Sequence, residues 1–454
     1  MLVIKVILGL LGLGIVVFVH ELGHFLAARL VKIDVEAFSI GWGNPILKKK
    51  IGKVEYRLGM FPIGGYCKMK GSSDYGTSDY REAWENMQGG KKPEVGSYLA
   101  ASPQARILVS FGGPFFNLIF AVLLLSMLWG FGFEINTLGN RIILASEVTP
   151  GQQYPADDAG LKTGDRIIEI AGHEISYYHE VQENIALNPE KPLSITVERD
   201  GEIYRLQVVP SLDKSSGAGK IGVYFWTDPV IENIREGSPA ARLGFLPGDI
   251  IAGVNGITIR NSIEFLKVME QKPDNLVIEY ERSGQRRTAE FSAEDLEGDL
   301  GFSWASVHYR TPNLSFPSAV AKGVKESFKT LIISVKSLRL LFKGIDLTQA
   351  VSGPVRITYM MGDMAAQSFG QGLGAGLRSI ADFVALISIA LCVMNLLPLP
   401  ILDGGMIILF LVELIRRKPA HPRAISAFQA CGMVIIFSLM IFALFGDILY
   451  FIRR

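Results

Sequence analysis

Four long apolar runs divide this chain. They cover residues 2–19, 107–133, 380–397 and 425–452, and each approaches or exceeds the roughly 20 residues that a helix needs to cross a bilayer. We therefore expect four membrane spans, over residues 1–33, 105–134, 376–415 and 424–452. The first run also resembles a cleavable signal peptide, but Lys5 is the only basic residue at its amino end, which disfavours that interpretation.

The basic residues of the loops predict how the spans are oriented. Lys and Arg are frequent between the first and second spans and again between the third and fourth, which is typical of cytoplasmic loops. Residues 72–104 are accordingly predicted to form a cytoplasmic loop. The polar region between the second and third spans then lies on the opposite side with both termini, although Arg453 and Arg454 oppose this arrangement.

Composition narrows the class of protein further. The chain has 454 residues, of which 49% are hydrophobic, and its mean hydropathy of +0.30 favours a polytopic membrane protein with a polar insertion. The net charge is +1 and no basic run flanks aromatic residues, so nucleic-acid binding is not expected. Only three cysteines occur, none of them between residues 68 and 391, so the polar insertion is expected to fold without disulfides.

Apolar and polar residues alternate over residues 34–71 and glycines interrupt them, which predicts a small β-structure. The polar insertion contains an internal repeat, because the segment beginning Gly164-Asp165 recurs at Gly248-Asp249, 84 residues later. Two α+β domains are expected, at 140–212 and 218–298.

After them, residues 318–345 form a basic amphipathic pattern typical of a helix on the membrane surface or of an ordinary packed helix. Residues 362–376 are predicted to be a flexible connection.

The first span ends in a pattern with clear chemistry. His20 and His24 are four residues apart, so on a helix both imidazoles project from one face and can bind one zinc ion, while Glu21 can activate a water molecule. Catalytic zinc usually has three protein ligands. Asp403 is a candidate for the third, because Pro398 and Pro400 interrupt the third span just before it, and broken backbone at membrane depth needs a protein-lined or watery cavity.

Together, the His-Glu-x-x-His run and the later Asn-x-x-Pro-x-Pro-x-Leu-Asp-Gly-Gly run resemble the site-2 protease family of intramembrane metalloproteases. The resemblance implies a Zn²⁺ cofactor, two tandem PDZ-like domains and a β-structure that re-enters the membrane, although a soluble cytoplasmic hairpin remains an alternative for that segment. By this resemblance the metal ligands are His20, His24 and Asp403, and the general base and acid is Glu21. Substrate contacts are expected at Asn395, Gly64 and Gly65 and, in a carboxylate-binding loop of the second repeat, at Ile221, Gly222 and Val223. Asn117, in the second span, is expected to serve mainly packing.

The predicted fold class is thus a polytopic α-helical membrane protein with four transmembrane helices, a membrane-associated β-structure and two tandem PDZ-like domains. The predicted function is zinc-dependent cleavage within or beside the transmembrane helix of single-span proteins, which by resemblance include an anti-sigma factor and signal-peptide remnants. We expect a monomer in the lipid of a bacterial inner membrane, with the repeats in the periplasm and the active site toward the cytoplasm. A catalytically inactive PDZ scaffold and a zinc transporter are the alternatives.

Overall fold

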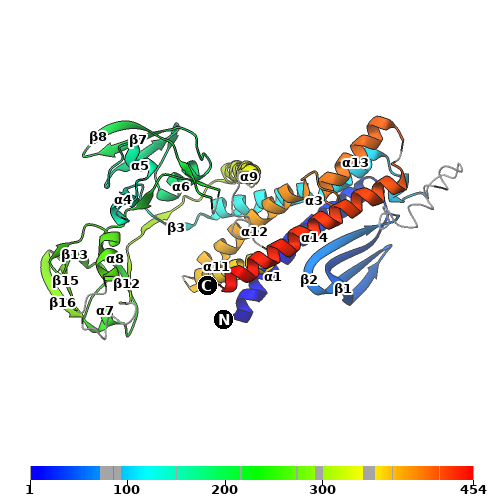
Figure 1. Ribbon diagram of the computed structural model, residues 1–454. Coiled ribbons are helices and arrows are strands. Elements are labelled where there is room, and N and C mark those ends of the chain that lie inside the picture. The colour runs from blue at the N-terminus through cyan, green and yellow to red at the C-terminus, as the bar shows by residue number, and fades with distance from the viewer. Residues whose placement is uncertain are drawn as a thin grey trace. The chain divides into compact units, whose positions relative to one another are not determined.

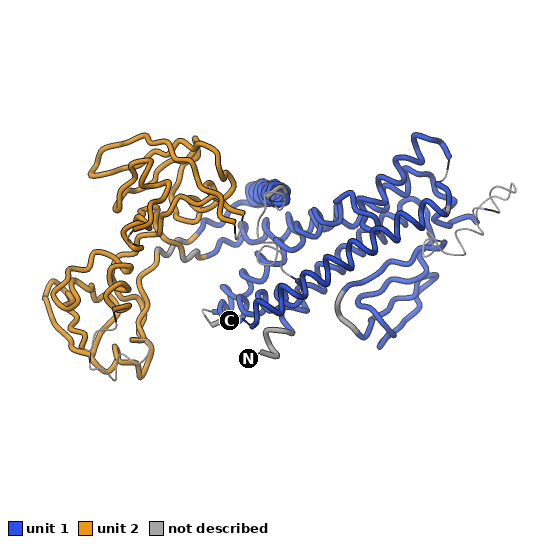
Figure 2. Tube along the Cα trace, in the orientation of Figure 1, with its two compact units in different colours: residues 1–133, 311–342, 346–454 blue, residues 134–310, 343–345 orange. Residues whose placement is uncertain are grey.

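The computed structural model describes residues 2–71, 85, 94–149, 151–214, 217–271, 275–291, 300–340, 353–370, 372–418 and 420–452. Most of the predicted loop at 72–104 and residues 341–345 of the predicted amphipathic helix lie outside the described residues. The chain divides into two compact units, one built mainly from the apolar helices and the other from residues 134–310 (Figure 2).

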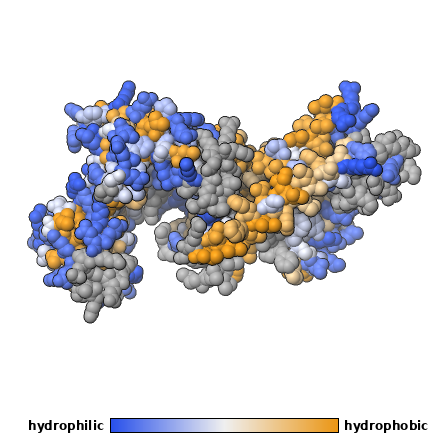
Figure 3. Space-filling model, in the orientation of Figure 1, coloured by the Kyte–Doolittle hydropathy of each residue, from blue (hydrophilic) through white to orange (hydrophobic). Residues whose placement is uncertain are grey.

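Four helices in the first unit are long and apolar enough to cross a membrane, as predicted. They are α1 (Leu2–Leu30), α3 (Pro103–Phe131), α12 (Leu373–Asn395) and α14 (Pro422–Ile452). α14 exposes a continuous series of large apolar side chains, and the apolar surface is visible along it in Figure 3. Such a surface is stable in contact with lipid and would be unusual in water.

Small residues allow the first two spans to pack closely. A Cβ atom at Gly112 of α3 would lie 2.7 Å from the carbonyl oxygen of Gly23 in α1, so only glycine permits this backbone approach. The second half of α1 therefore lies directly against the first half of α3 (Figure 1). Ser102 caps the start of α3, accepting a hydrogen bond from the backbone N–H of Ala105.

The third span is broken, as the prolines predicted. α12 ends at Asn395, and after an irregular stretch α13 (Asp403–Arg416) begins. Pro398 and Pro400 lie in this stretch, and Ile401 has a left-handed backbone with φ of 77°. The break places Asp403 on the first turn of α13.

The prediction of a flexible connection over residues 362–376 was wrong. Most of this segment belongs to α11 (Pro354–Gly370), and α12 already begins at Leu373. The glycines and alanines here serve helix packing: Met361 and Ala365 are buried, and α11 packs against α1. The buried Asp447 carboxylate of α14 caps α11 by accepting from the backbone N–H groups of Gly353, Val355 and Arg356, at 2.8, 3.1 and 3.1 Å.

The predicted amphipathic segment is helical. α9 (Phe316–Leu340) packs against α3, with Ser327 fully buried and Lys322 Nζ 4.6 Å from the ring centre of Trp129. This packed face agrees with the helical spacing of its apolar residues. Its position on a membrane surface stays a prediction.

The predicted β-structure is a sheet folded from β1 (Val35–Ile51) and β2 (Val54–Met69). Residues 37–40 pair with 65–68 on one side and with 55–58 on the other, and residues 48–51 pair back onto 54–57. Phe38 of this sheet packs against Phe18 and Phe25 of α1, with ring centres 5.8 and 5.5 Å apart. The sheet is therefore anchored to the helix that carries His20 and His24. The 3-10 helix η1 (Tyr98–Ala100) precedes α3.

The second unit contains the predicted repeat. β3 (Glu134–Thr137) pairs with β18 (Val307–Arg310) at its two ends. The first repeat comprises β4 (Ile142–Leu144), α4 (Ala145–Val148), α5 (Pro155–Asp158), β5 (Arg166–Ile170), β6 (His173–Glu174), α6 (Tyr178–Ala186), β7 (Leu193–Arg199), β8 (Glu202–Val208), β9 (Ser211–Leu212), β10 (Gly219–Lys220) and β11 (Val223–Phe225). The second comprises β12 (Ile231–Ile234), α7 (Pro239–Arg242), β13 (Ile250–Val254), β14 (Ile257–Thr258), α8 (Ser262–Glu270), β15 (Leu276–Arg282), β16 (Gln285–Phe291) and β17 (Phe302–Trp304).

The two repeats share one topology. The main sheets have the strand orders β6-β5-β7-β8 and β14-β13-β15-β16, and each is covered by its own buried apolar cluster. In each repeat the last strand returns to pair with the first, β11 with β4 and β17 with β12. Equivalent elements thus recur in the same order, which agrees with two α+β domains, while the PDZ-like character remains a prediction.

This returning strand corrects one assignment. We predicted that Ile221, Gly222 and Val223 begin the second repeat, but Val223 pairs with Leu144, and Ile221 is buried in the core of the first repeat. Residues 300–302 hold the equivalent place in the second repeat, beyond the predicted boundary at 298. Long-range strand pairing, which no local pattern reveals, decides to which repeat such a segment belongs.

Candidate metal centre

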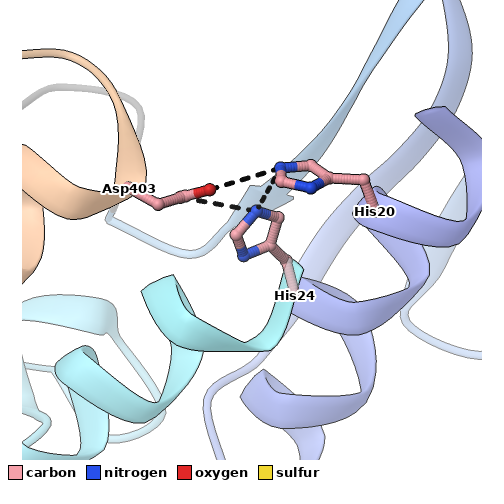
Figure 4. Close-up of side chains that lie close together, drawn as sticks. All are labelled: His20, His24 and Asp403. Atoms are coloured by element: carbon pink, nitrogen blue, oxygen red, sulfur yellow. Dashed lines mark hydrogen bonds and ion pairs between the residues drawn. The ribbon is translucent and has the colours of Figure 1, made fainter. Parts of the chain in front are cut away.

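The structure brings His20, His24 and Asp403 together. The two histidines lie one turn apart on α1, and Asp403 approaches them from the start of α13, with all three side chains pointing toward one another (Figure 4). His20 Nε2 lies 3.3 Å from Asp403 Oδ2, His24 Nε2 lies 3.5 Å from Asp403 Oδ1, and the two Nε2 atoms are 3.1 Å apart. Two segments almost 400 residues apart in sequence thus form one cluster.

The opposite ring nitrogens define which tautomer each histidine adopts. His24 Nδ1 lies 2.8 Å from the backbone carbonyl oxygen of Val109, which can only accept, so Nδ1 carries a proton and in the neutral ring the lone pair lies on Nε2. His20 Nδ1 lies 3.2 Å from the side-chain amide of Asn117, whose Oδ1 is buried without a hydrogen-bond partner in the described structure. A half-turn of this amide exchanges its two nearly identical ends and lets Oδ1 accept from His20 Nδ1–H.

This donor set fits a zinc ion. Two imidazole Nε2 atoms and a carboxylate converge on one point, and each is a group that ligates zinc. Ligand atoms at 2.0–2.1 Å from a tetrahedral zinc lie roughly 3.3 Å from one another. The observed separations of 3.1, 3.3 and 3.5 Å agree with that value. His20, His24 and Asp403 would therefore hold the metal, and the fourth position would be left for water or substrate.

Glu21 lies beside this cluster and is covered by β2. The backbone N–H of Cys67 donates a hydrogen bond to the Glu21 carboxylate. A Cβ atom at Gly65 would lie 3.0 Å from Glu21 Cγ, so the strand approaches Glu21 as closely as a glycine allows. Residues 65–68 pair with 37–40, and within the described chain no strand pairs with their other side. Gly65 thus lies beside Glu21, whereas Gly64 packs on Trp42, and their contact with a substrate stays a prediction.

A cavity of 360 Å³ adjoins the two ligands His24 and Asp403. Its walls include the polar side chains of Ser110 and Gln429 and the apolar side chain of Met69. A space of this volume holds several water molecules, since one water occupies about 30 Å³ in the liquid. The cluster can therefore be hydrated although its residues lie on apolar helices.

Two asparagines of the apolar helices differ in their contacts with the cluster. Asn395 ends α12 before the break, and within the described residues no hydrogen bond joins its side chain to the three clustered residues. Asn117, for which packing was expected, is fully buried and touches His20. The signal that could have identified Asn117 is its position inside an apolar span, where a polar side chain is costly unless it has a partner. Ile221, Gly222 and Val223 belong to the other compact unit.

Comparisons with known proteins agree with this chemistry. The model of peptidase family M50 matches residues 8–439. A protein of Treponema pallidum named "Putative zinc metalloprotease" is 34% identical over 449 residues, which cover 98% of this chain and 99% of the relative. Relatives with the same description from Neisseria meningitidis and Borreliella burgdorferi are 29% and 28% identical, covering 96% and 98% of this chain and the same shares of the relatives.

Both the donor set and its setting on apolar helices define a membrane metallopeptidase. The chain belongs to peptidase family M50, the site-2 protease family. It is a zinc metalloendopeptidase, and Zn²⁺ is its expected cofactor.

Proposed function

We propose that this enzyme cleaves single-span membrane proteins within or beside their transmembrane helix. The observation that carries the proposal is the position of the candidate metal cluster on helices long and apolar enough to cross a bilayer. A soluble peptidase has no need of ligands in such a setting, where each ionisable side chain is costly. The cavity beside His24 and Asp403 supports the proposal further, because hydrolysis in a membrane needs room for water.

The side chains around the cluster support a metal-assisted mechanism. When bound, zinc polarises the scissile carbonyl and acidifies a water molecule. Glu21 takes the proton of that water and later delivers it to the leaving amine, which its place directly after His20 allows. His24 and His20 keep their Nε2 lone pairs directed at the centre. Asn395 contacts the substrate or its oxyanion in this proposal.

The free side of residues 65–68 is the proposed substrate-binding edge. A peptide bond inside a helix is shielded by its own hydrogen bonds, so a transmembrane substrate has to unwind before it can be cut. An extended segment paired along this edge would satisfy its backbone and pass over Glu21. Gly64 and Gly65 are the proposed substrate contacts on this strand, and Gly65 lets it lie close to Glu21 of α1.

The natural substrate in this proposal is an anti-sigma factor already trimmed outside the membrane, together with signal-peptide remnants, in an envelope stress response. The enzyme acts as a monomer in a bacterial inner membrane with its site toward the cytoplasm. The two repeats, as PDZ-like domains on the outer side, exclude untrimmed substrates or hold their new carboxyl end. Ile221, Gly222 and Val223 are the proposed contacts in the first repeat.

The experiment that tests this function is the substitution Glu21→Gln. We expect the variant to bind zinc as the wild type does and to cleave a reconstituted single-span substrate about 10²–10⁴-fold more slowly, because the proton acceptor is lost while the ligands remain. Glu36→Gln on β1, an exposed glutamate, is the matched control. Undiminished cleavage by Glu21→Gln would remove the role of Glu21, and wild-type enzyme that cuts soluble peptides but no membrane-embedded one would refute the intramembrane substrate.

A further inference from the structure

Helix α3 supplies no ligand, yet it contacts both ligand-bearing histidines. The backbone carbonyl of Val109 accepts from His24, and the side chain of Asn117 adjoins His20 at 3.2 Å. Between them Gly113 lies under both rings, because a Cβ atom there would collide with Nε2 of His24 and approach Nε2 of His20 to 2.8 Å. Two turns of α3 thus determine the tautomer and the position of both imidazoles.

The same helix is also joined to the element that carries Asp403. Near its start, Arg106 Nη2 lies 2.7 Å from Glu413 Oε2 of α13, with the two side chains only 7% and 2% exposed. The guanidinium also lies over the ring of Phe410, 4.8 Å from its centre, and Glu413 Oε1 accepts from the backbone N–H of Ala420 at 2.9 Å. The ion pair therefore connects both α13 and the segment that follows it to α3.

A buried ion pair is weak evidence for stability, since the cost of desolvating both charges cancels much of their attraction. The fixed geometry of the ion pair explains better why it is present between α3 and α13. Asp403 follows an irregular stretch of chain with two prolines, so nothing in its local backbone holds the carboxylate at ligand distance from α1. A contact further along α13 can provide that restraint.

We propose that α3 holds the metal ligands in position, with Asn117 positioning His20 and the Arg106–Glu413 pair positioning Asp403. These are positioning residues that act through the ligands and do not touch the reacting atoms. The inference rests on the zinc-dependent activity of the family and not on the identity of the substrate. Groups that hydrogen-bond to metal ligands typically contribute 10–100-fold in metal affinity.

The first test concerns Asn117. We expect Asn117→Leu, which keeps the shape and removes the acceptor, to weaken zinc binding 10–100-fold in competition with a chelator, using the full-length protein in detergent. Asn117→Asp restores an acceptor for Nδ1–H and should bind zinc within a few-fold of the wild type. Ser388→Ala is the matched control, because Ser388 Oγ donates to the backbone carbonyl of Asn117 and not to its side-chain amide. Wild-type zinc affinity in Asn117→Leu would overturn the role of Asn117.

The second test separates positioning from folding at Glu413. We expect Glu413→Gln to lower zinc affinity and kcat with little change in KM. Asp447→Asn removes a comparable buried carboxylate of α14, whose partners are the first amides of α11, and should leave zinc affinity unchanged even where it lowers thermal stability. Equal loss of zinc in both variants, or in neither, would show that the ion pair only stabilises the fold.

Discussion

The aspartates of the two repeats and Asp403 of the first unit differ in how the chain partners their carboxylates. In the second unit, Asp249 receives two hydrogen bonds of 2.7 Å from Arg282, and Asp165 receives the same two from Arg199. In the first unit, Asp403 has only the imidazoles of His20 and His24 within ion-pair distance among the described residues. The carboxylates of the repeats are paired with guanidinium groups of the chain itself, whereas that of Asp403 faces two groups that can also ligate a metal.

This difference separates a structural carboxylate from a functional one. Each repeat satisfies its aspartate completely, since the backbone N–H of Leu246 donates to Asp249 and that of Lys162 donates to Asp165. Such a site is complete when the chain folds. The cluster around Asp403 consists of three zinc-ligating groups directed at one point, so binding of a metal there adds to the stability of the folded chain.

Replacing Asp403 should have the largest effect. We expect Asp403→Ala to lose tightly bound zinc and to lower cleavage about 10³-fold or more, because one of three ligands is missing. In the absence of zinc, the same variant should lose little stability, because within the described residues Asp403 is at ion-pair distance from two imidazoles and from no lysine or arginine. Metal analysis, a cleavage assay and thermal unfolding in the presence of a chelator check these outcomes. A clear loss of metal-free stability would contradict the contrast between the units.

Replacing Asp249 should lower stability and leave zinc binding unchanged, which is the reverse of Asp403→Ala. Removing a carboxylate from a buried ion pair leaves Arg282 without its partner, and we expect Asp249→Ala to cost about 3 kcal/mol in the stability of the second repeat. Zinc binding should stay as in the wild type. Limited proteolysis of the full-length protein, followed at residues 231–304, measures the local loss, and protection equal to the wild type would disprove the structural role.

The pH dependence of the second repeat follows from the same contact. Burial alone would raise the pKa of Asp249, but the hydrogen bonds from Arg282 and from the N–H of Leu246 outweigh it and hold that pKa below its ordinary value. A lowered pKa means that the folded repeat binds this proton less readily than the unfolded chain, whose aspartates titrate near pH 3.9. The stability from Asp249 should therefore be complete above about pH 4 and be lost progressively below it. Pepsin digestion across pH 5 to 2 measures this, and Asp249→Asn should remove that part of the dependence.

Local patterns predicted much of this protein. The spacing of His20 and His24 sets their common face on any helix, and the prolines before Asp403 predicted the broken span. The repeat was visible from two Gly-Asp segments, because each begins the same strand in its own copy. The length and polarity of the apolar runs predicted the four spanning helices.

Pairings between distant segments could not be predicted from such patterns. Arg106 and Glu413 are separated by most of the chain, and nothing around either residue indicates the other. Residues 221–223 precede the second repeat in sequence but pair with the first strand of the first repeat. α11 was mistaken for a connection because its glycines and alanines are also the residues that allow helices to pack closely.

The smallest effect is expected at the N-terminal caps of α6 and α8, where the two repeats differ. In the first, Glu180 Oε2 accepts from the backbone N–H groups of Ser176 and Tyr177, at 2.7 and 3.0 Å, at the start of α6. In the second, Glu264 makes one such bond, with Arg260, but the side chain of Asn261 also caps α8.

We expect Glu180→Ala to destabilise α6 by about 1 kcal/mol, and Glu264→Ala to cost α8 roughly half as much because the Asn261 cap remains. Hydrogen exchange of the first-turn amides of each helix, in the full-length protein, measures both. Equal effects would mean that the Asn261 side chain adds nothing to the cap, and that the repeats differ in sequence at this point without differing in stability.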